Sequence, residues 1–215
     1  MTEKAKLYKC VDSLRESLDL SHLDPVDTKD MIDQIGHIDL TYHCFHTPGL
    51  CGIAMVGDKV DTIVLNSQRT LKEQSFDAGH EIIHLYKHRN TLDHFNCFSH
   101  SHPKQNSFIE WQANEGAAEL ILPYRLFVPL VANALPSLKD ISDFNHLRAE
   151  LADTFYATEP MLNNRLEGLK YEIYQYANGV SLEDLQFLSR REQTKRGICV
   201  QSVNDMELSC LYDCL

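Results

Sequence analysis

Apolar residues recur every three to four positions over most of this chain, which is the spacing of helices with one buried face. The pattern predicts an amphipathic helix over residues 4–19 and a short helix over 26–35. Two more helices are expected at about 70–88 and over 108–123, the second ending at a proline, which disfavours further helix. Residues 124–176 follow the same period, so helices are expected to dominate the second half of the chain.

A shorter region between the second and third helices follows the two-residue period of strands instead. Residues 38–45 alternate between apolar and polar side chains, as a half-buried strand does. Residues 53–56 and 62–65 predict two further strands, which a turn at 57–59 joins as a hairpin. We therefore expect an α+β fold with a small antiparallel sheet ahead of the third helix. The stretch 89–106 is polar and irregular, and a loop is predicted there.

Composition narrows the class of protein. With 43% hydrophobic and 24% charged residues in 215, the chain has ordinary globular composition. A formal net charge of −11 repels nucleic acid, so direct nucleic-acid binding is not expected. Neither a signal peptide nor an apolar run that could span a bilayer is recognisable, so no membrane partner is expected. Seven scattered cysteines predict reduced thiols and a cytoplasmic location, and the cluster Cys199, Cys210 and Cys214 has no neighbouring histidine that would favour a metal site.

One short motif offers candidate chemistry: His80-Glu81-Ile82-Ile83-His84, inside the predicted helix 70–88. Positions i and i+4 lie on one helix face, so both imidazoles can reach one metal ion at roughly 2.0–2.1 Å. Glu81 projects at another angle beside the metal, from where it can accept a proton from the attacking water. Because the chain has 11 histidines, the match needs a third ligand before it carries weight.

A catalytic zinc ion takes three protein ligands and keeps one open position. Helix 108–123 offers Glu110, on a face whose alanines would let a neighbouring helix come close. Asn114 lies one turn from Glu110 and could hold its carboxylate. The rival third ligands are histidines one turn beyond the motif and in the predicted loop, namely His88, His94, His100 and His102.

The two motifs together resemble those of the ImmA/IrrE metallopeptidases, cytosolic zincins common on phages and mobile elements. Residues 76–84 correspond to the family's F-x-x-A-H-E-x-x-H, and residues 110–123 to its E-x-x-A-N-x-F-A-A-E-L-L-M-P. The family completes its zinc site with the first glutamate of the second motif, which implies Glu110 here. Two departures are Ile83, where the family often has glycine, and Gly116, where it has an aromatic residue. Both imply a change of packing without loss of a ligand.

The resemblance covers about residues 50–170 and implies a zinc-dependent endopeptidase with Zn²⁺ as cofactor and Glu81 as general base. It implies that the substrate is a DNA-binding, helix-turn-helix repressor, cleaved to relieve silencing of a prophage, mobile element or stress regulon. The implied organisation is a zincin-like core over 1–123, a helical, helix-turn-helix-like segment over 124–177, and a C-terminal tail, 178–215. The oxyanion needs a further donor, for which the candidates are Tyr86, His102, Tyr124 and Arg125.

Two other classes of function stay open on sequence alone. One is a non-proteolytic regulator that uses the helix-turn-helix-like run 151–161, in which Thr158 would cap the second helix. Arg165 is nearly the only basic residue on that helix, which disfavours a DNA reader. The other is an antitoxin-like interaction protein with a structural zinc. An intact Glu81 argues against it, because a structural site is closed and needs no base.

Overall fold

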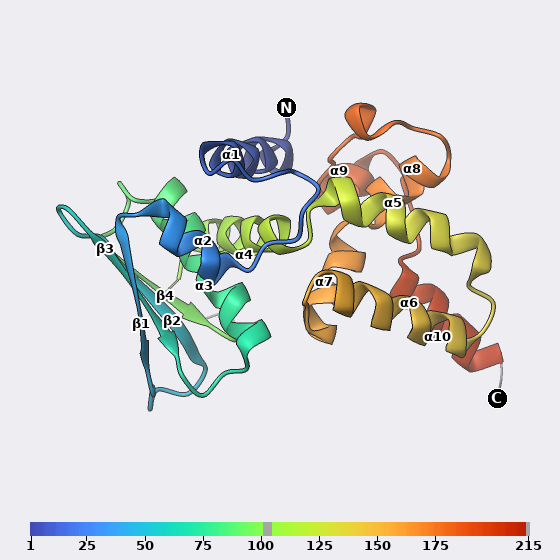
Figure 1. Cartoon of the computed structure of the whole chain (residues 1–215). Helices are drawn as coiled ribbons and strands as arrows, with labels where there is room; N and C mark the ends of the chain where they lie inside the picture. Colours follow the sequence, from blue (N-terminus) through green and yellow to red (C-terminus); the bar gives the residue numbers. More distant parts are fainter. Residues whose placement is uncertain (101–104, 214–215) are drawn as a thin grey trace. The chain divides into compact units, whose positions relative to one another are not determined.

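The computed structural model describes residues 1–100 and 105–213, and Figure 1 traces its elements along the chain. The chain forms two compact units. The motif unit, which carries both sequence motifs, comprises residues 10–21 and 25–121. The C-terminal unit comprises residues 1–9, 22–24 and 122–215. In the described residues no single helix has the length and apolarity of a membrane span, and only α4 (Ser107–Ile121) counted together with residues 124–137 passes that test.

The motif unit combines helices with a four-stranded sheet, which confirms the predicted α+β class. Its strands are β1 (Ile38–His43), β2 (Leu50–Met55), β3 (Asp61–Asn66) and β4 (His94–Phe98), in the spatial order β1-β3-β2-β4. Its helices are α2 (Thr28–Ile35), α3 (Leu71–Lys87), α4 (Ser107–Ile121) and most of α1 (Glu3–Ser17).

The sheet is mixed, and it differs from the prediction in two ways. The expected hairpin of β2 and β3 is present, with Ile53 opposite Val64, but β1 runs parallel to β3. β1 pairs with the edge of β3 that β2 leaves open, and it runs in the same direction as β3. The expectation of a wholly antiparallel sheet is therefore wrong. The predicted loop over 89–106 also contains β4, which pairs antiparallel with β2. Its polar flanks conceal a short alternation in which Phe95 and Cys97 are buried.

Helix α3 packs across one face of this sheet, and most of its residues from Gln74 to Leu85 are buried (Figure 1). It begins with a capping box: Glu73 donates its backbone N–H to the Thr70 hydroxyl at 3.4 Å, and Thr70 donates its own to the Glu73 carboxylate at 2.9 Å. Alternate residues of β3 are buried, and Ile63 and Leu65 are part of the core that α3 completes. The sequence motif is therefore held on a rigid, buried helix.

Small residues bring α4 close to α3. A Cβ atom placed on Gly79 would lie 3.3 Å from Cβ of Ala117, so the two backbones approach at this point. A Cβ on Gly116 would lie only 2.8 Å from Cγ1 of Ile83, which fills the space beside it. This close approach is what the alanines of α4 predict, and it lets a short glutamate side chain on α4 reach the histidines of α3.

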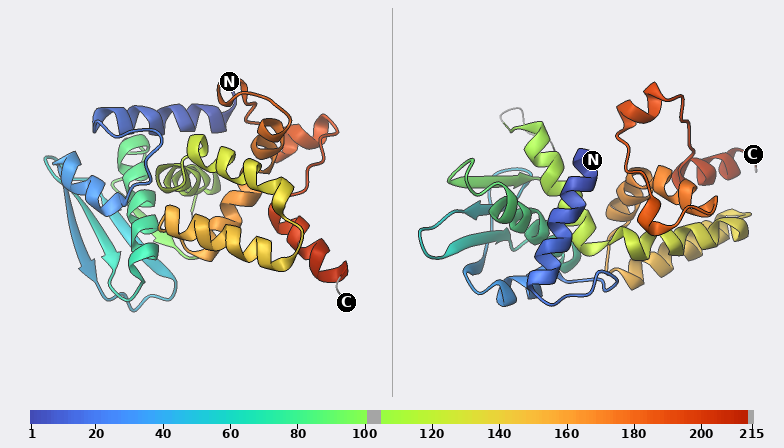
Figure 2. Two further views of the ribbon diagram at one scale, coloured as in Figure 1. Left: turned by 45° about the vertical axis from the view of Figure 1, so that its right-hand side comes forward. Right: turned by 90° about the horizontal axis from the view of Figure 1, so that it is seen from above.

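The C-terminal unit is helical, as the pattern over 124–176 predicts. Its helices are α5 (Tyr124–Ala134), α6 (Ile141–Thr154), α7 (Glu159–Gly168), α8 (Lys170–Ala177), α9 (Arg190–Lys195) and α10 (Val203–Asp213), with 3₁₀ turns η1 (Leu135–Ser137) and η2 (Leu182–Asp184). Figure 2 shows the red α10 against α6 and α7, so the segment after residue 177 contributes to the packing of this unit.

The helix-turn-helix-like pair is formed by α6 and α7, with Thr158 at the N-cap of α7. Arg165 of α7 is only 2% exposed. Its Nε donates to the carbonyl of Leu122 and its Nη1 to the hydroxyl of Tyr8, both at 2.9 Å. This arginine therefore serves packing inside the unit.

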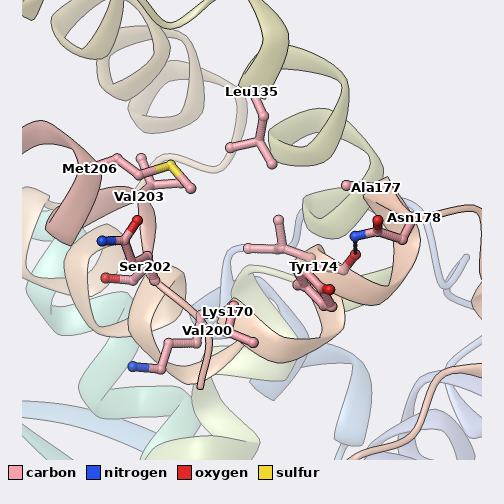
Figure 3. A pocket seen from close by; sticks show the side chains of 11 residues that line it. Leu135, Lys170, Tyr174, Ala177, Asn178, Val200, Ser202, Val203 and Met206 are labelled. Carbon is pink, nitrogen blue, oxygen red and sulfur yellow. Dashed lines mark hydrogen bonds between the residues drawn. The ribbon is translucent and has the colours of Figure 1, made fainter. Parts of the chain in front are cut away.

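Figure 3 shows a pocket in the same unit, with a cavity of about 160 Å³. Leu135, Val203 and Met206 give it an apolar wall, and Lys170 is the only charged residue among the described residues that line it. Among the described residues its lining holds no acidic side chain to pair with Lys170, so it offers no acid–base arrangement for catalysis.

Candidate metal centre

Three predicted ligands come together between α3 and α4. The donor atoms of His80, His84 and Glu110 all lie within 4.8 Å of one another. Nε2 of His80 and Nε2 of His84 are 3.0 Å apart, and the Glu110 carboxylate oxygens lie 3.4 Å from the first and 3.7 Å from the second. Both histidines are buried, whereas the Glu110 side chain is 20% exposed, so the cluster opens toward the glutamate.

Neighbouring amides fix which nitrogen of each ring carries the proton. Nδ1 of His80 lies 3.0 Å from Oδ1 of Asn114, which only accepts, so Nδ1 donates and Nε2 keeps its lone pair. For His84 a relay has the same effect. His88 donates from Nε2 to Oε1 of Gln112 at 3.0 Å, which leaves its Nδ1 as an acceptor. Nδ1 of His84 therefore donates to Nδ1 of His88, at 3.1 Å, and Nε2 of His84 keeps its lone pair.

Two lone pairs thus face each other across 3.0 Å, which is repulsive for neutral rings. Burial, and then the nearby His80 and His88 rings, lower the pKa of His84 to about 2, so the His84 ring does not take up a proton at neutral pH. A cation between the two nitrogens and Glu110 removes the repulsion and balances the carboxylate. Two imidazoles and one carboxylate are also a ligand set that catalytic zinc uses. The side chains present therefore fit a divalent metal ion.

Glu81 lies beside this cluster, completely buried on α3. Within the described parts of the chain neither of its carboxylate oxygens has a hydrogen-bond partner. Burial, followed by the charges of Asp77 and Glu110, raises the pKa of Glu81 well above its ordinary value, against a smaller opposing effect of the nearby Cys97 backbone N–H, which does not reach hydrogen-bond geometry. Gly52 on β2 leaves room for it, since a Cβ there would lie 3.0 Å from Oε1. A buried carboxyl group without a fixed partner can exchange a proton with a reactant, which is what general catalysis requires.

The other predicted residues lie in different surroundings. Asn114 accepts a hydrogen bond from His80, whereas the sequence suggested that its side chain would hold the Glu110 carboxylate. Tyr86 is two positions after His84, about 200° around the helix, and its ring is 46% exposed, so it is not brought to the cluster. Tyr124 and Arg125 belong to the C-terminal unit, where the Tyr124 ring stacks on Tyr8 at 5.4 Å and the Arg125 guanidinium lies 4.7 Å from the Tyr124 ring. The fourth oxyanion candidate, His102, lies outside the described residues.

The rival third ligands take other roles. Both ring nitrogens of His88 are engaged, one by His84 and one by Gln112. His94 is an exposed residue of β4, and His100 is exposed beyond that strand. In place of a histidine, β4 contributes Phe95, whose ring stacks on His84 with centroids 4.4 Å apart and planes 13° apart. Sequence analysis missed this contact and the relay because both join distant segments.

A comparison with protein-family models now decides the class. Residues 26–167 match the model of the Peptidase M78 family, described as the IrrE N-terminal-like domain. The chain belongs to this family. As a Peptidase M78 member it is a metallopeptidase, which acts on a protein substrate with a divalent metal ion. No curated protein sequence matches the chain closely enough to add a relative.

One further group of side chains in this Peptidase M78 domain was not foreseen. Cys51, Asp77 and Cys97 bring two sulfur atoms and a carboxylate oxygen within 4.8 Å of one another. The sequence places them on three separate segments, one of which was predicted to be a loop. A strand prediction at 94–98 with Cys97 on its buried side was the signal that would have pointed to this group.

Proposed function

We propose that this metallopeptidase is a cytoplasmic zinc endopeptidase that cleaves a helix-turn-helix transcriptional repressor and so relieves silencing of a prophage, a mobile element or a stress regulon. The observation that carries the zinc part is the pair of opposed lone pairs on His80 and His84, with the Glu110 carboxylate beside them. The observation that carries the hydrolytic part is the buried and unpartnered Glu81 next to that cluster.

The residues divide the work of peptide hydrolysis. His80, His84 and Glu110 would hold zinc, and Asn114 and His88 orient the two imidazoles through their Nδ1 atoms. When bound, zinc supplies Lewis-acid activation of water and of the scissile carbonyl. Glu81 accepts the proton of the attacking water and passes it to the leaving amine.

The sheet offers a site for an extended peptide. β4 is an edge strand, and its Phe95 stacks directly on His84, so this edge borders the metal centre. The carbonyl of Asn96 accepts a hydrogen bond from the Gln105 side chain at 2.6 Å, which covers one backbone acceptor of the strand. A substrate segment that replaces this side chain and adds to the edge would lie beside the histidines. Such a segment must be flexible or locally unfolded in the substrate.

Charge supports a DNA-binding protein as the substrate. The net charge of −11 favours a partner with a basic surface, which a repressor presents to DNA. The same charge disfavours direct binding of nucleic acid by this chain. The burial of Arg165 in α7 removes the one arginine that a DNA-reading role of the helix-turn-helix-like pair would need.

Metal analysis tests the first part of the proposal. Purified protein should contain about one zinc per chain, lost in His80→Ala and His84→Ala and strongly reduced in Glu110→Ala. Unchanged metal content in the first two variants would refute the ligand assignment. A loss of zinc in His88→Ala comparable to that in His84→Ala would move the third ligand to His88.

Cleavage tests the second part. The protein is co-expressed with a repressor whose gene neighbours its own, and fragments are identified by mass spectrometry. One cut in a linker or near the repressor's C-terminus is expected, with the zinc-loaded Glu81→Gln protein slower by about 10²–10⁴-fold. Equal cleavage by Glu81→Gln would refute the mechanism. An intact repressor beside zinc-loaded protein would refute the repressor as substrate under those conditions and point to another protein substrate or to an activating signal. Rapid degradation of casein would indicate a general protease.

A further inference from the structure

Two buried thiols lie next to the proposed general base and take no part in the mechanism above. They are Cys51 on β2 and Cys97 on β4, and with Asp77 of α3 they place their sulfur and oxygen atoms within 4.8 Å of one another. The exposed fractions of the two cysteines are only 2% and 4%. Cys51 directly precedes Gly52, the residue against which the Glu81 carboxylate lies.

A local irregularity of the sheet brings these thiols together. Strict alternation along β2 would turn Cys51 to the face opposite Gly52. However, the register of β2 against β4 shifts between Leu50 and Gly52, so Cys51 is an additional residue beside the Gly52–Cys97 pair. Such a bulge redirects a side chain, and here Leu50, Cys51 and Gly52 are all buried. The bulge thus turns Cys51 toward Cys97.

Two sulfurs and a carboxylate are also a possible donor set for a metal ion, but the carboxylate is already occupied. Arg69 donates from Nε to Oδ2 of Asp77 at 2.5 Å and from Nη2 to Oδ1 at 3.5 Å. A metal ion would have to share this carboxylate with a guanidinium cation. The ion pair is neutral without a metal, which leaves the two thiols as the reactive pair.

The two thiols differ in acidity, which gives each its own part in the chemistry. A hydrogen bond with Cys97 lowers the pKa of Cys51, with Arg69 acting in the same direction, and this outweighs the opposing effects of burial and of Asp77. The Cys51 thiol can also donate from Sγ to the carbonyl of Gly49, at 3.3 Å. The hydrogen bond with Cys51, followed by burial, raises the pKa of Cys97 well above its ordinary value. On these directions Cys51 is the attacking thiol and Cys97 the resolving thiol.

We propose that Cys51 and Cys97 form a reversible disulfide when the protein meets a hydroperoxide. The Cys51 thiolate attacks one oxygen of hydrogen peroxide, the O–O bond breaks, and hydroxide leaves, so that Cys51 becomes a sulfenic acid. Cys97 then loses its proton and its sulfur attacks the Cys51 sulfur, which expels the sulfenic oxygen as water. Two thiols lose two electrons and two protons, and the peroxide is reduced to two waters.

The oxidant reaches the pair through the edge of the sheet. In the described sheet β4 pairs only with β2, so local opening of this edge strand exposes both sulfurs without global unfolding. Formation of the bond brings the sulfurs to about 2.05 Å, which shifts the bulge and Gly52 against Glu81. On the basis of the proposed function, the oxidised protein should cleave its substrate about 10–100-fold more slowly.

Peptide mapping of the zinc-loaded full chain tests the pair. The protein is treated with hydrogen peroxide, its free thiols are alkylated, and digested peptides are analysed by mass spectrometry. A cross-link between Cys51 and Cys97 is expected, lost again after dithiothreitol. The matched control Cys44→Ser should retain it. Cys97→Ser should lack it and instead accumulate a Cys51 sulfenic acid that dimedone traps.

Three results would overturn this inference: both thiols alkylated after peroxide, a cross-link that forms only in denatured protein, or a second zinc equivalent that is lost in Cys51→Ser. A cross-link with unchanged cleavage would refute the coupling to Glu81. Because the cross-link is read by mass, its absence is distinguishable from failure of the proposed function, which would leave the reduced protein without cleavage activity.

Discussion

The relay from Gln112 through His88 to His84 makes a quantitative prediction about metal affinity. Replacing His88 with phenylalanine keeps a ring in a buried position but removes the acceptor for Nδ1 of His84. If the relay holds His84 in its metal-binding tautomer, His88→Phe should weaken zinc binding without abolishing it. Gln112→Leu should weaken it less, because His88 is still present and only its own orientation is released.

The magnitude follows from the burial of the site. His84 is 0% exposed, so an Nδ1–H without an acceptor costs about 1–3 kcal/mol. The metal-free variant avoids this cost by moving the proton to Nε2, which also removes the repulsion with His80. Metal binding must reverse that move, so the same 1–3 kcal/mol opposes binding. This corresponds to a zinc Kd that is about 5–150-fold higher, in the range of about 10–100-fold known for residues that orient ligands.

The assay is a titration of metal-free protein with zinc in competition with a chromophoric chelator. His94→Ala is the matched control, since it removes an exposed imidazole from β4 and should leave Kd unchanged. Circular dichroism verifies that each variant is folded. A Kd for His88→Phe equal to wild type would show that the relay does not select the tautomer. Complete loss of binding, as in His84→Ala, would make His88 a ligand.

Three further predictions concern neighbours of the site. Gly52→Ala places a methyl group 3.0 Å from Oε1 of Glu81, so peptidase activity should fall about 10–100-fold while zinc content stays the same; a parallel loss of zinc would contradict this. Gly116→Ala should destabilise the protein by about 1–2 kcal/mol in urea unfolding, because the crowding against Ile83 outweighs better helix propensity, and Ile83→Ala in the same chain should recover part of the loss. Burial raises the pKa of Asp77 from 3.8 to about 6, although Arg69 opposes it. A carboxyl group with a raised pKa stabilises the fold below pH 3.8 and loses this contribution as pH rises through 6. The unfolding free energy of wild type relative to Asp77→Asn should therefore fall by up to about 3 kcal/mol from acid to neutral pH, and a difference independent of pH would refute the assignment.

The predictable part of the centre is the part set by spacing within single helices. The i, i+4 positions of His80 and His84 fix their common face, and the small residues of α4 predict its close approach to α3. By contrast, the only local sign of β4 is the alternation of Phe95 and Cys97 within five residues between polar neighbours, and that sign does not show that β4 pairs with β2. The contacts of Phe95 with His84 and of Cys51 with Cys97 depend on that pairing, so they were beyond the reach of sequence patterns.

The two departures from the family pattern lie at positions that are in contact in the structure. Ile83 stands where the family often has glycine, and Gly116 where it has an aromatic residue, and the structure brings these two positions into contact. A large side chain on α3 now fills the space that a large side chain on α4 would occupy. Each position alone reads as an anomaly, because a sequence does not say which residues on two helices meet.

The stacking of Phe95 on His84 makes β4 a shared element of two binding equilibria. A peptide that adds to this edge strand would restrict its motion, and with it the Phe95 ring that stacks on His84, one of the proposed metal ligands. If the bound metal helps to order β4, the peptide no longer has to provide that ordering, so it binds more tightly when metal is present. By reciprocity the bound peptide raises the metal affinity by the same factor. Zinc and substrate would thus be cooperative ligands of one strand, so the protein would retain its metal most firmly while a substrate is bound.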